Sequence, residues 1–365
     1  MPDQTVTAVI ADLPKLCVNS DSSIRQAIAC IEQNTAKIAL VVDDENRLLD
    51  TITDGDVRRA VLAATDLDAS VTLLRKRKVA SRLYKQAVTA PVGSDVDALT
   101  QLMLDRDVRQ VPLVDDAERV VGLVTLRELV LDDVLPVQAV VMAGGHGTRL
   151  RPLTEQLPKP MLPLGGRPIL ERIIEQLREA GIRKVNVTTH YKGEVIAKHF
   201  GDGKEFGVQI SYVEEHQPLG TAGGLSQLEP SDEPLLVING DILTRVDFQA
   251  MMDFHAEHQA DMSVAVRQHE LQVPYGVIET DAERIVNITE KPTVRHFINA
   301  GIYLLNPGVS QLIPNNDSYD MTDLIVRLIA DGRRVISFPI REYWMDIGQH
   351  ADQKQAEEDL RDGKV

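Results

Sequence analysis

The feature that most constrains the fold is an internal repeat in the first part of the sequence. Residues 40–59 (LVVDDENRLLDTITDGDVRR) match residues 112–131 (PLVDDAERVVGLVTLRELVL) at a constant offset of 72 residues. Each copy has the pattern of a strand, an acidic turn, a second strand and a helix that opens on a threonine and an acidic residue. The identical pairs are Val42/Val114, Asp43/Asp115, Asp44/Asp116, Arg47/Arg119 and Thr53/Thr125. Two α+β modules of the same fold are therefore predicted, at about residues 14–65 and 80–134.

A second domain is predicted to begin near Pro136. A chain of 365 residues, 43% of them hydrophobic, exceeds what a single core usually serves. Beyond Pro136, buried strand patterns alternate with amphipathic helical ones such as residues 168–181 (PILERIIEQLREAG). This alternation predicts an α/β fold with a mostly parallel mixed sheet and helices on both faces. We expect one domain at residues 1–135 and another at residues 136–365.

The charge balance limits the partners that the protein can bind. The formal net charge of −16 should repel nucleic acid and anionic lipid, so neither is an expected partner. A small anionic ligand would need a dedicated cationic pocket. Cys17 and Cys30 lie in a segment without signal-peptide architecture, and no apolar run reaches the roughly 18 residues of a membrane span. These features predict a cytoplasmic protein with reduced thiols.

A glycine-rich basic loop, residues 143–160 (AGGHGTRLRPLTEQLPKP), follows the first strand of the predicted α/β domain. Glycines leave backbone N–H groups free to approach an anion. No Walker A sequence is present, and Arg149 stands where a dinucleotide fingerprint needs its third glycine. Arg149 offers a cationic fork, and Lys159, between two prolines, offers a point charge on a stiffened backbone. The loop predicts a phosphate site; the alternative is a mobile surface loop with incidental charges.

The loop contains the motifs Gly-Gly-x-Gly-Thr-Arg-Leu, Pro-Leu-Thr and Pro-Lys-Pro in order. The later motifs are EEHQPLGTAGG (214–224), VINGD (237–241), PYGVIE (274–279), ITEKP (288–292), NAGIYLL (299–305) and YWMDIG (343–348). Over roughly residues 138–350 the chain thereby resembles the sugar-1-phosphate nucleotidyltransferases. The resemblance implies a Rossmann-like domain that joins a nucleoside triphosphate to a sugar 1-phosphate and releases pyrophosphate. It extends to guanylyltransferases of bacterial surface-sugar pathways, including those that make GDP-glucosamine for nonulosonic acids such as legionaminic acid.

The resemblance also implies roles for individual residues. Arg149, Lys159 and Asp241 would be catalytic. The nucleotide would be bound by Gly144, Gly145, Gly147, Thr148, Arg149, Glu215, Gly220 and Thr221. The sugar and its phosphate would be bound by Tyr275, Gly276, Glu290, Lys291 and Asn299.

Two carboxylates form a predicted magnesium site. Asp241 ends an apolar strand, which in an open α/β sheet places it at the ligand-binding crevice, and Asp346 follows the only tryptophan. Mg²⁺ binds through one or two carboxylates together with substrate phosphates, so Asp241 and Asp346 are candidate ligands. The alternative is that each aspartate caps a turn or a helix.

The resemblance implies that Glu215, five positions before Gly220, lies near the base, and a carboxylate there leads us to expect GTP as the preferred triphosphate. Guanine presents two adjacent N–H donors that one carboxylate can accept together, whereas uracil and thymine flank a single N–H with carbonyl oxygens. In the alternative interpretation, Glu215 belongs to a solvated acidic pair with Glu214. Transfer from UTP, CTP or dTTP is the competing hypothesis within the same family. A nucleotide-sensing regulator without catalysis is the alternative from another class.

The two N-terminal modules resemble a tandem pair of cystathionine-β-synthase-type (CBS) domains. In that family, a threonine or serine and an aspartate three residues later grip the ribose of a bound nucleotide, and Thr53 and Asp56 fit this pattern. The second module keeps Thr125 but has Glu128, and Asp50 stands where a glycine is usual. The resemblance implies a regulatory nucleotide and a homo-oligomer. Alternatively, Thr53 and Thr125 only cap helices.

Overall fold

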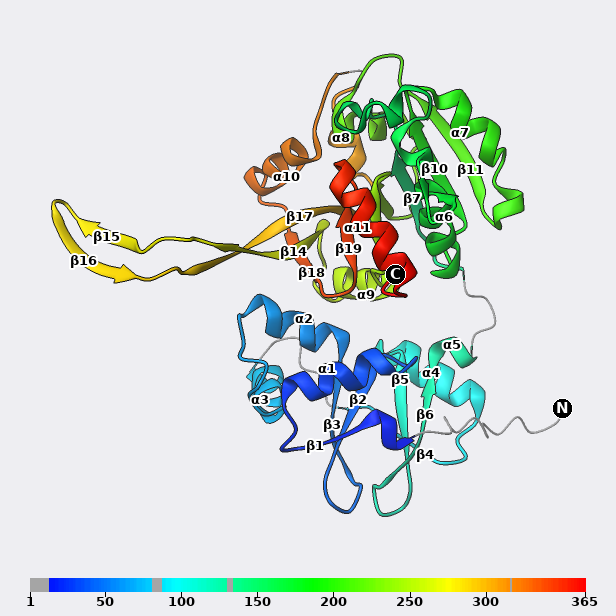
Figure 1. Ribbon diagram of the computed structural model, residues 1–365. Helices are drawn as coiled ribbons and strands as arrows, with labels where there is room; N and C mark the ends of the chain where they lie inside the picture. Colours follow the sequence, from blue (N-terminus) through cyan, green and yellow to red (C-terminus); the bar gives the residue numbers. More distant parts are fainter. Residues whose placement is uncertain (1–12, 81–86, 130–133, 316) are drawn as a thin grey trace. The chain divides into compact units, whose positions relative to one another are not determined.

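The computed structural model describes residues 13–80, 87–129, 134–315 and 317–365. The chain divides after residue 133 into two compact units, and each is described by itself (Figure 1). The predicted second module includes residues 81–86 and 130–133, which lie outside the described residues.

The first unit contains the predicted repeat. Its strands are β1 (Cys17–Asn19), β2 (Ile38–Val42), β3 (Leu48–Thr53), β4 (Ala90–Pro91), β5 (Gln110–Val114) and β6 (Val120–Thr125). Its helices are η1 (Leu13–Leu16), α1 (Ile24–Gln33), α2 (Asp54–Leu62), α3 (Thr72–Ala80), α4 (Val96–Arg106) and α5 (Leu126–Leu129). The sheets β1-β2-β3 and β4-β5-β6 have the same order and the same strand directions. The offset of 72 therefore relates two copies of one α+β fold.

The two modules pair with each other. The backbone N–H of Leu48 donates to the carbonyl of Glu118 at 3.2 Å, and the N–H of Val120 donates to the carbonyl of Asn46 at 3.0 Å. Apolar side chains of both modules also share one cluster, in which Leu40 lies with Leu123. The first unit is thus one folded body, because backbone hydrogen bonds and apolar packing both cross between its halves.

The second unit is built on a seven-stranded sheet of order β11-β10-β7-β12-β17-β14-β18, in which only β17 runs against the other strands. This is the predicted mostly parallel mixed sheet. The strands are β7 (Gln138–Met142), β8 (Pro163–Leu164), β9 (Arg167–Pro168), β10 (Lys184–Thr189), β11 (Gln209–Glu214), β12 (Leu235–Asn239), β13 (Ile242–Thr244), β14 (Met262–Gln272), β15 (Val277–Asp281), β16 (Arg284–Thr289), β17 (Thr293–Leu305), β18 (Val335–Ile340) and β19 (Trp344–Asp346).

Helices cover both faces of this sheet. The α-helices are α6 (Ile169–Glu179), α7 (Gly193–Phe200), α8 (Gly220–Gly223), α9 (Phe248–Glu257), α10 (Met321–Ala330) and α11 (His350–Arg361). The short 3₁₀ helices are η2 (Thr148–Leu150), η3 (Leu153–Glu155), η4 (Lys159–Met161), η5 (Lys204–Phe206), η6 (Gly224–Gln227) and η7 (Val309–Leu312).

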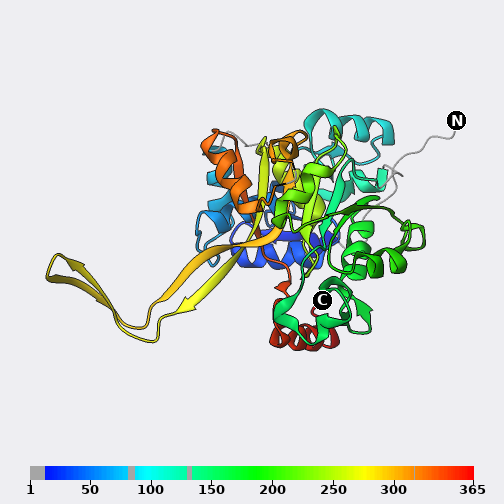
Figure 2. The ribbon, with the colours of Figure 1, turned by 90° about the horizontal axis from the view of Figure 1, so that it is seen from above.

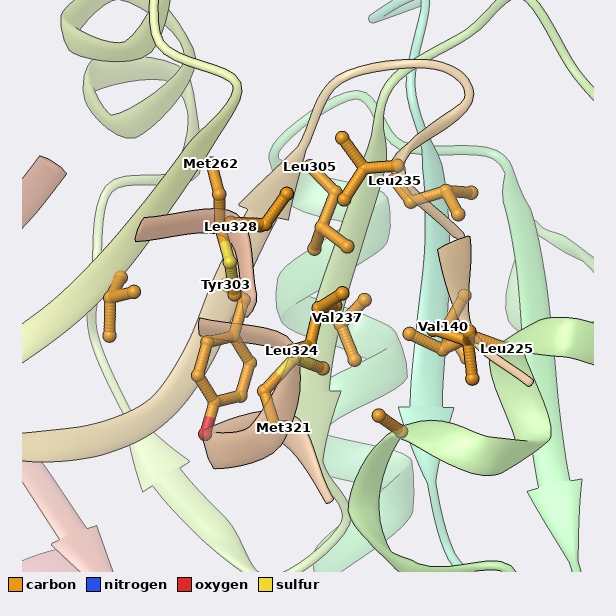
Figure 3. Close-up of a cluster of buried hydrophobic side chains, with 14 of the residues drawn as sticks. Val140, Leu225, Leu235, Val237, Met262, Tyr303, Leu305, Met321, Leu324 and Leu328 are labelled. Carbon is orange, nitrogen blue, oxygen red and sulfur yellow. The ribbon is translucent and has the colours of Figure 1, made fainter. Parts of the chain in front are cut away.

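The core lies between the sheet and its helices. On one face, Leu324 of α10 packs with Val237 of β12 and Tyr303 of β17 (Figure 3). On the other face, Phe254 of α9 meets Phe338 of β18 edge to face, with ring centroids 5.5 Å apart. Side chains alternate across a strand, so Val335 and Phe338 of β18 serve opposite faces. This two-sided burial explains why the strands read as nearly continuous apolar runs.

The segments GVIET (276–280) and RIVNITE (284–290) lie largely in strands β15 and β16, and these strands lie outside the central sheet. β14 and β17 continue past the sheet as a two-stranded ladder that ends at the pair Gln272 and Thr293, and β15 pairs only with β16 beyond it. We call residues 268–298 the arm. It projects from the α/β body in two perpendicular views (Figures 1 and 2).

Candidate active site

Lys159, Asp241 and Asp346 converge at the carboxyl-terminal edge of the central sheet. The ammonium of Lys159 is hydrogen-bonded to the Asp241 carboxylate, and its Nζ lies 3.9 Å from Oδ1 of Asp346. Lys159 is only 9% exposed, whereas the side chain of Asp346 is about half exposed. A buried cation between two carboxylates therefore faces an accessible edge, which suits a site that binds a charged ligand.

A short antiparallel ladder brings the two aspartates together from opposite ends of the unit. β13 pairs with β19 so that Ile242 lies opposite Asp346, and the N–H of Ile347 donates to the carbonyl of Asp241 at 3.0 Å. Gly240, just before Asp241, approaches β7 so closely that a Cβ there would lie 2.7 Å from the carbonyl oxygen of Met142. The VINGD glycine thus lets Asp241 sit beside the end of the first strand.

The electrostatics of this edge favour cations. Burial and the neighbouring Asp241 carboxylate raise the pKa of Asp346, because each disfavours its charged form. Lys159 and Arg149 act in the opposite direction. Two adjacent carboxylates are a suitable donor pair for a divalent cation. Among the described residues, no group of three or more His, Cys, Asp or Glu side chains could hold a metal ion.

The glycine-rich loop is held by contacts between Gly147 and residues further along the loop. Gly147 has φ +60°, and a Cβ there would lie 2.8 Å from Cγ2 of Thr154 and 3.1 Å from Cβ of Lys159. Buried Thr154 donates its hydroxyl to the carbonyl of Gly147 at 2.8 Å. Gly145, Thr148 and Arg149 of the loop are exposed. Gly147 is held in place by Thr154, while neighbouring residues of the loop are open to solvent. This arrangement fits a phosphate site better than the alternative of a mobile loop.

Glu215 is buried between two glycines. It is 7% exposed, and added Cβ atoms at Gly144 and Gly224 would lie 3.2 Å and 2.7 Å from its carboxylate oxygens. Burial raises the pKa of Glu215, while hydrogen bonds from Leu219 and Thr188 lower it. The alternative that Glu215 belongs to a solvated acidic pair is therefore wrong, since only Glu214 is exposed. A buried carboxylate beside the glycine-rich loop can accept hydrogen bonds from a ligand's N–H donors.

The turn that contains Gly220 and Thr221 is held by residues about 100 positions later in the sequence. The carbonyl of Tyr319 accepts from the N–H groups of Ala222 and Gly223, at 2.9 and 3.0 Å. Asp320 accepts from the backbone N–H of Thr221 at 2.9 Å. The contacts of Tyr319 and Asp320 with this turn were not predicted from the sequence. An aspartate before an apolar helix signals an N-cap, which Asp320 is, but no local pattern shows its distant partner.

The predicted sugar residues do not join this cluster. Tyr275, Glu290 and Lys291 are exposed on the arm, and Gly276 is half-buried there against Glu290. Asn299 lies at the base of the arm, where its Oδ1 accepts from the N–H of Gly301 at 3.0 Å. The structure therefore groups the predicted nucleotide and metal residues but leaves most of the predicted sugar residues elsewhere.

In the first unit, Thr53 is the N-cap residue of α2, and Thr125 directly precedes α5. The hydroxyl of Thr53 donates to Asp56 at 3.1 Å, and that of Thr125 donates to Glu128 at 2.9 Å. Asp56 is 4% exposed, and Nζ of Lys78 lies 3.1 Å from it. Arg59 also donates to Asp56 at 2.7 Å. The buried Asp56 carboxylate is thus already paired with Lys78 and Arg59.

These two units match two known families. Residues 138–363 match the family described as Nucleotidyl transferase, and residues 10–63 and 79–132 each match the CBS domain. The chain belongs to the nucleotidyl transferase family. It carries a tandem CBS pair before the family domain, as the resemblance predicted. Among the described residues, no helix combines the length and the apolar character needed to span a membrane.

Several relatives within this family act on sugar 1-phosphates. The chain is 37% identical over 233 residues to the mannose-1-phosphate guanylyltransferase of Mycobacterium tuberculosis, which covers 61% of this chain and 64% of that one. It is 34% identical over 240 residues to the UTP–glucose-1-phosphate uridylyltransferase of Synechocystis, with 60% and 62% covered. The chain thus spans less than two thirds of the length of these relatives.

A solved structure has the same fold. The putative glucose-1-phosphate thymidylyltransferase from Bacillus anthracis, solved in complex with a sucrose, superimposes with a TM-score of 0.50 at 25% identity. The match covers 62% of this chain and 96% of that one. The shared region has the size of the second unit.

Proposed function

We propose that the protein transfers a nucleoside monophosphate from a triphosphate to a sugar 1-phosphate and releases pyrophosphate. The observation that supports this most is the position of Lys159. This buried residue, near the end of the glycine-rich loop, lies between Asp241 and Asp346. A phosphate oxygen of the sugar 1-phosphate would attack the α-phosphorus in line with the departing pyrophosphate. A phosphate monoester has a second pKa of about 6, so this nucleophile is already charged at neutral pH and needs no general base.

The chain's own residues then align the substrates and neutralise their charge. The backbone of Gly144, Gly145 and Gly147 and the Thr148 hydroxyl would bind the triphosphate, Arg149 would reach over it, and Lys159 would contact the reacting phosphates. These are positioning and electrostatic roles, which dominate catalysis of phosphoryl transfer. Intact basic and acidic groups at this edge favour an enzyme over a regulator that only senses nucleotides.

Asp241 and Asp346 would hold a divalent metal ion, which we propose is Mg²⁺. Their adjacent carboxylates, one of them with a raised pKa, fit a cation that keeps substrate phosphates as its other ligands. When bound, the ion supplies positive charge to the phosphates. Lys159 supplies part of that charge from the protein itself.

GTP is the proposed triphosphate because Glu215 is buried beside the phosphate loop. We predict that Glu215→Gln lowers kcat/KM with GTP about ten- to a hundredfold, because one of two charge-assisted hydrogen bonds to guanine is lost. The ratio of kcat/KM with GTP to kcat/KM with UTP or dTTP should therefore fall. Initial rates with each triphosphate, measured for both proteins, check this. An unchanged ranking of the bases in the variant would contradict the assignment, as would a wild-type preference for UTP.

The sugar is proposed to be a hexose or hexosamine 1-phosphate. The relatives named for mannose 1-phosphate and glucose 1-phosphate support the hexose class. Glucosamine 1-phosphate belongs among the candidates on the resemblance to surface-sugar guanylyltransferases. Transfer from UTP, CTP or dTTP remains the competing proposal, favoured by the uridylyltransferase relative.

The CBS pair is proposed to bind a regulatory nucleotide and not to take part in catalysis. All residues with a proposed chemical role lie beyond Pro136, in the second unit. We predict that a truncated chain beginning at Pro136 keeps basal activity within about threefold of the full chain, since domains with their own cores generally fold alone. Added adenine nucleotides should alter the rate of the full chain only. Loss of all activity in a truncated chain with a native circular dichroism spectrum would contradict this separation.

A further inference from the structure

The connection between β10 and α7 lies beside the glycine-rich loop. β10 and β7 are parallel neighbours, and Thr188 of β10 pairs with Met142, the last residue of β7. The backbone N–H of Ala143, where the loop begins, donates to the carbonyl of Thr188 at 3.0 Å. The carboxyl ends of parallel strands meet at one edge of the sheet, so the segments that follow them are neighbours there. Residues 190–192, which we call the clamp, therefore lie next to residues 143–160.

The clamp contacts the loop in three ways. The rings of Tyr191 and His146 stack, with centroids 5.4 Å apart and planes at 27°. The hydroxyl of Tyr191 donates to the carbonyl of Thr154 at 3.2 Å. Nζ of Lys192 donates to the carbonyl of Glu155 at 2.6 Å. The clamp thus holds the loop at two places that are separated in the sequence.

These contacts enclose the part of the loop that is open to a ligand. Thr148 and Arg149, both exposed, lie between the two places in the sequence. Thr154 also donates its hydroxyl to the carbonyl of Gly147 at 2.8 Å. A chain of hydrogen bonds therefore runs from Tyr191 through Thr154 to the glycines. Groups that are fixed before a ligand arrives cost less reorganisation when they bind it.

The turn that forms the clamp is tightly constrained. Lys192 has φ +55°, in the left-handed region that residues other than glycine rarely adopt. At the next residue, Gly193, a Cβ would lie 2.8 Å from Cβ of Thr189. Such backbone conformations persist only when the surroundings determine them, and they cluster at functional sites. The contacts of Lys192 and Tyr191 with the loop supply that surrounding structure.

The clamp also contacts Glu215. Nδ1 of His190 donates to the carbonyl of Glu215 at 2.7 Å, and the rings of His190 and His146 meet edge to face with centroids 5.3 Å apart. A Cβ at Gly144 would lie 3.4 Å from Cβ of His190. The clamp therefore joins the loop to the buried carboxylate beside it.

We propose that Tyr191 is a positioning residue, which holds the glycine-rich loop in the conformation that binds the triphosphate. It acts through His146 and Thr154 and not by contact with the substrate. A loop that is already ordered loses less conformational freedom when its ligand binds, so the clamp raises the affinity of the site. The triphosphate as the ligand rests on the proposed function. The holding of the loop rests on the contacts of Tyr191 and Lys192.

Replacing Tyr191 in the full chain tests this role. Tyr191→Leu removes the ring and the hydroxyl but keeps an apolar side chain. The KM for GTP should rise about tenfold, the combined effect of one hydrogen bond and one ring contact. The KM for the sugar 1-phosphate that the wild type uses best, and kcat, should change less than about twofold. Tyr191→Phe keeps the ring and should give an intermediate KM for GTP.

The matched control is Tyr212→Leu. Tyr212 is also half-buried, and its hydroxyl donates to the carbonyl of Gly201 at 2.9 Å, but it lies on β11 at the edge of the central sheet. This variant should keep the wild-type KM for GTP. An unchanged KM for GTP in Tyr191→Leu would overturn the proposal. An equal rise in the control, or an equal rise in both KM values of Tyr191→Leu, would also overturn it.

A second measurement, hydrogen exchange in the ligand-free chain, needs no activity. The N–H groups of Leu150 and Glu155 donate to the carbonyls of Gly147 and Pro152, each at 3.0 Å. These bonds break when the loop opens, so their exchange reports how firmly the loop is held. In Tyr191→Leu both amides should exchange about tenfold faster, while those of β7 stay unchanged. Unchanged exchange in the loop, or faster exchange throughout the second unit, would contradict the positioning role.

The two measurements separate this inference from the proposed function. If the wild type releases no pyrophosphate with any substrate pair, the proposed function fails, and the exchange of Leu150 and Glu155 still decides whether Tyr191 holds the loop. If the wild type is active and the exchange is the same in Tyr191→Leu, the proposed function stands and the role of Tyr191 is overturned.

Discussion

Replacing Lys159 with alanine should lower kcat about a hundred- to a thousandfold, the cost typical of removing one preorganised charge stabiliser. Lys159 is the cation most deeply buried at this edge, and it touches Asp241 directly. Its loss removes positive charge where the phosphates would gather and leaves Asp241 without its ammonium partner. Single-turnover rates with saturating substrates measure the effect on the chemical step.

The matched control is Lys204→Ala. Lys204 also pairs with an aspartate, Asp202, at 2.6 Å in the same unit, but both side chains are exposed. An exposed pair contributes little to stability, so this variant should keep wild-type activity. An equal loss of activity in the two variants would contradict the catalytic role. So would a Lys159→Ala protein with a melting temperature far below that of the wild type, because the loss of activity would then come from unfolding.

Asp241→Asn should lower activity by a factor on the order of a hundred or more and raise the magnesium concentration needed for half-maximal rate. An amide keeps the shape of the side chain but removes the charge that the proposed metal ion needs. Asp346→Asn should act in the same direction. A magnesium titration of the initial rate, from micromolar to millimolar, separates weaker metal binding from a uniform loss.

Asp202→Asn provides the control for charge removal, because Asp202 is exposed and lies outside the proposed site. It should leave the magnesium dependence unchanged. Wild-type activity of Asp241→Asn at low magnesium would remove the metal assignment.

Local patterns predicted much of the fold. The 72-residue repeat gave β2 and β5, and β3 and β6, at matching positions because each copy has the same alternation of apolar strand and acidic turn. The glycine-rich loop was recognisable as a candidate phosphate site because its glycines, Arg149 and Lys159 are close in sequence. Contacts between residues far apart in the sequence could not be predicted in this way. The anchoring of Thr221 by Asp320 spans 99 residues, and no local periodicity reports such a contact.

The position of the predicted sugar-binding residues was also not predictable from local patterns. The resemblance implied a shared role for PYGVIE and ITEKP, and each segment lies only partly in a strand, at Val277–Glu279 of β15 and at Ile288–Thr289 of β16. That these strands would leave the central sheet could not be predicted, because a strand pattern indicates a strand but not the neighbours with which it pairs. Only the exposure of Ile278 and Ile288 in the folded chain distinguishes these strands from those of the central sheet.

The most direct test of the central claim is a panel of triphosphates against sugar 1-phosphates, read by pyrophosphate release. GTP, UTP, CTP, dTTP and ATP would each be combined with mannose, glucose and glucosamine 1-phosphate in the presence of magnesium. We predict release that requires both substrates and is fastest with GTP. Pyrophosphate release no faster than that from the triphosphate alone, for every pair, would contradict sugar-1-phosphate nucleotidyl transfer by this chain.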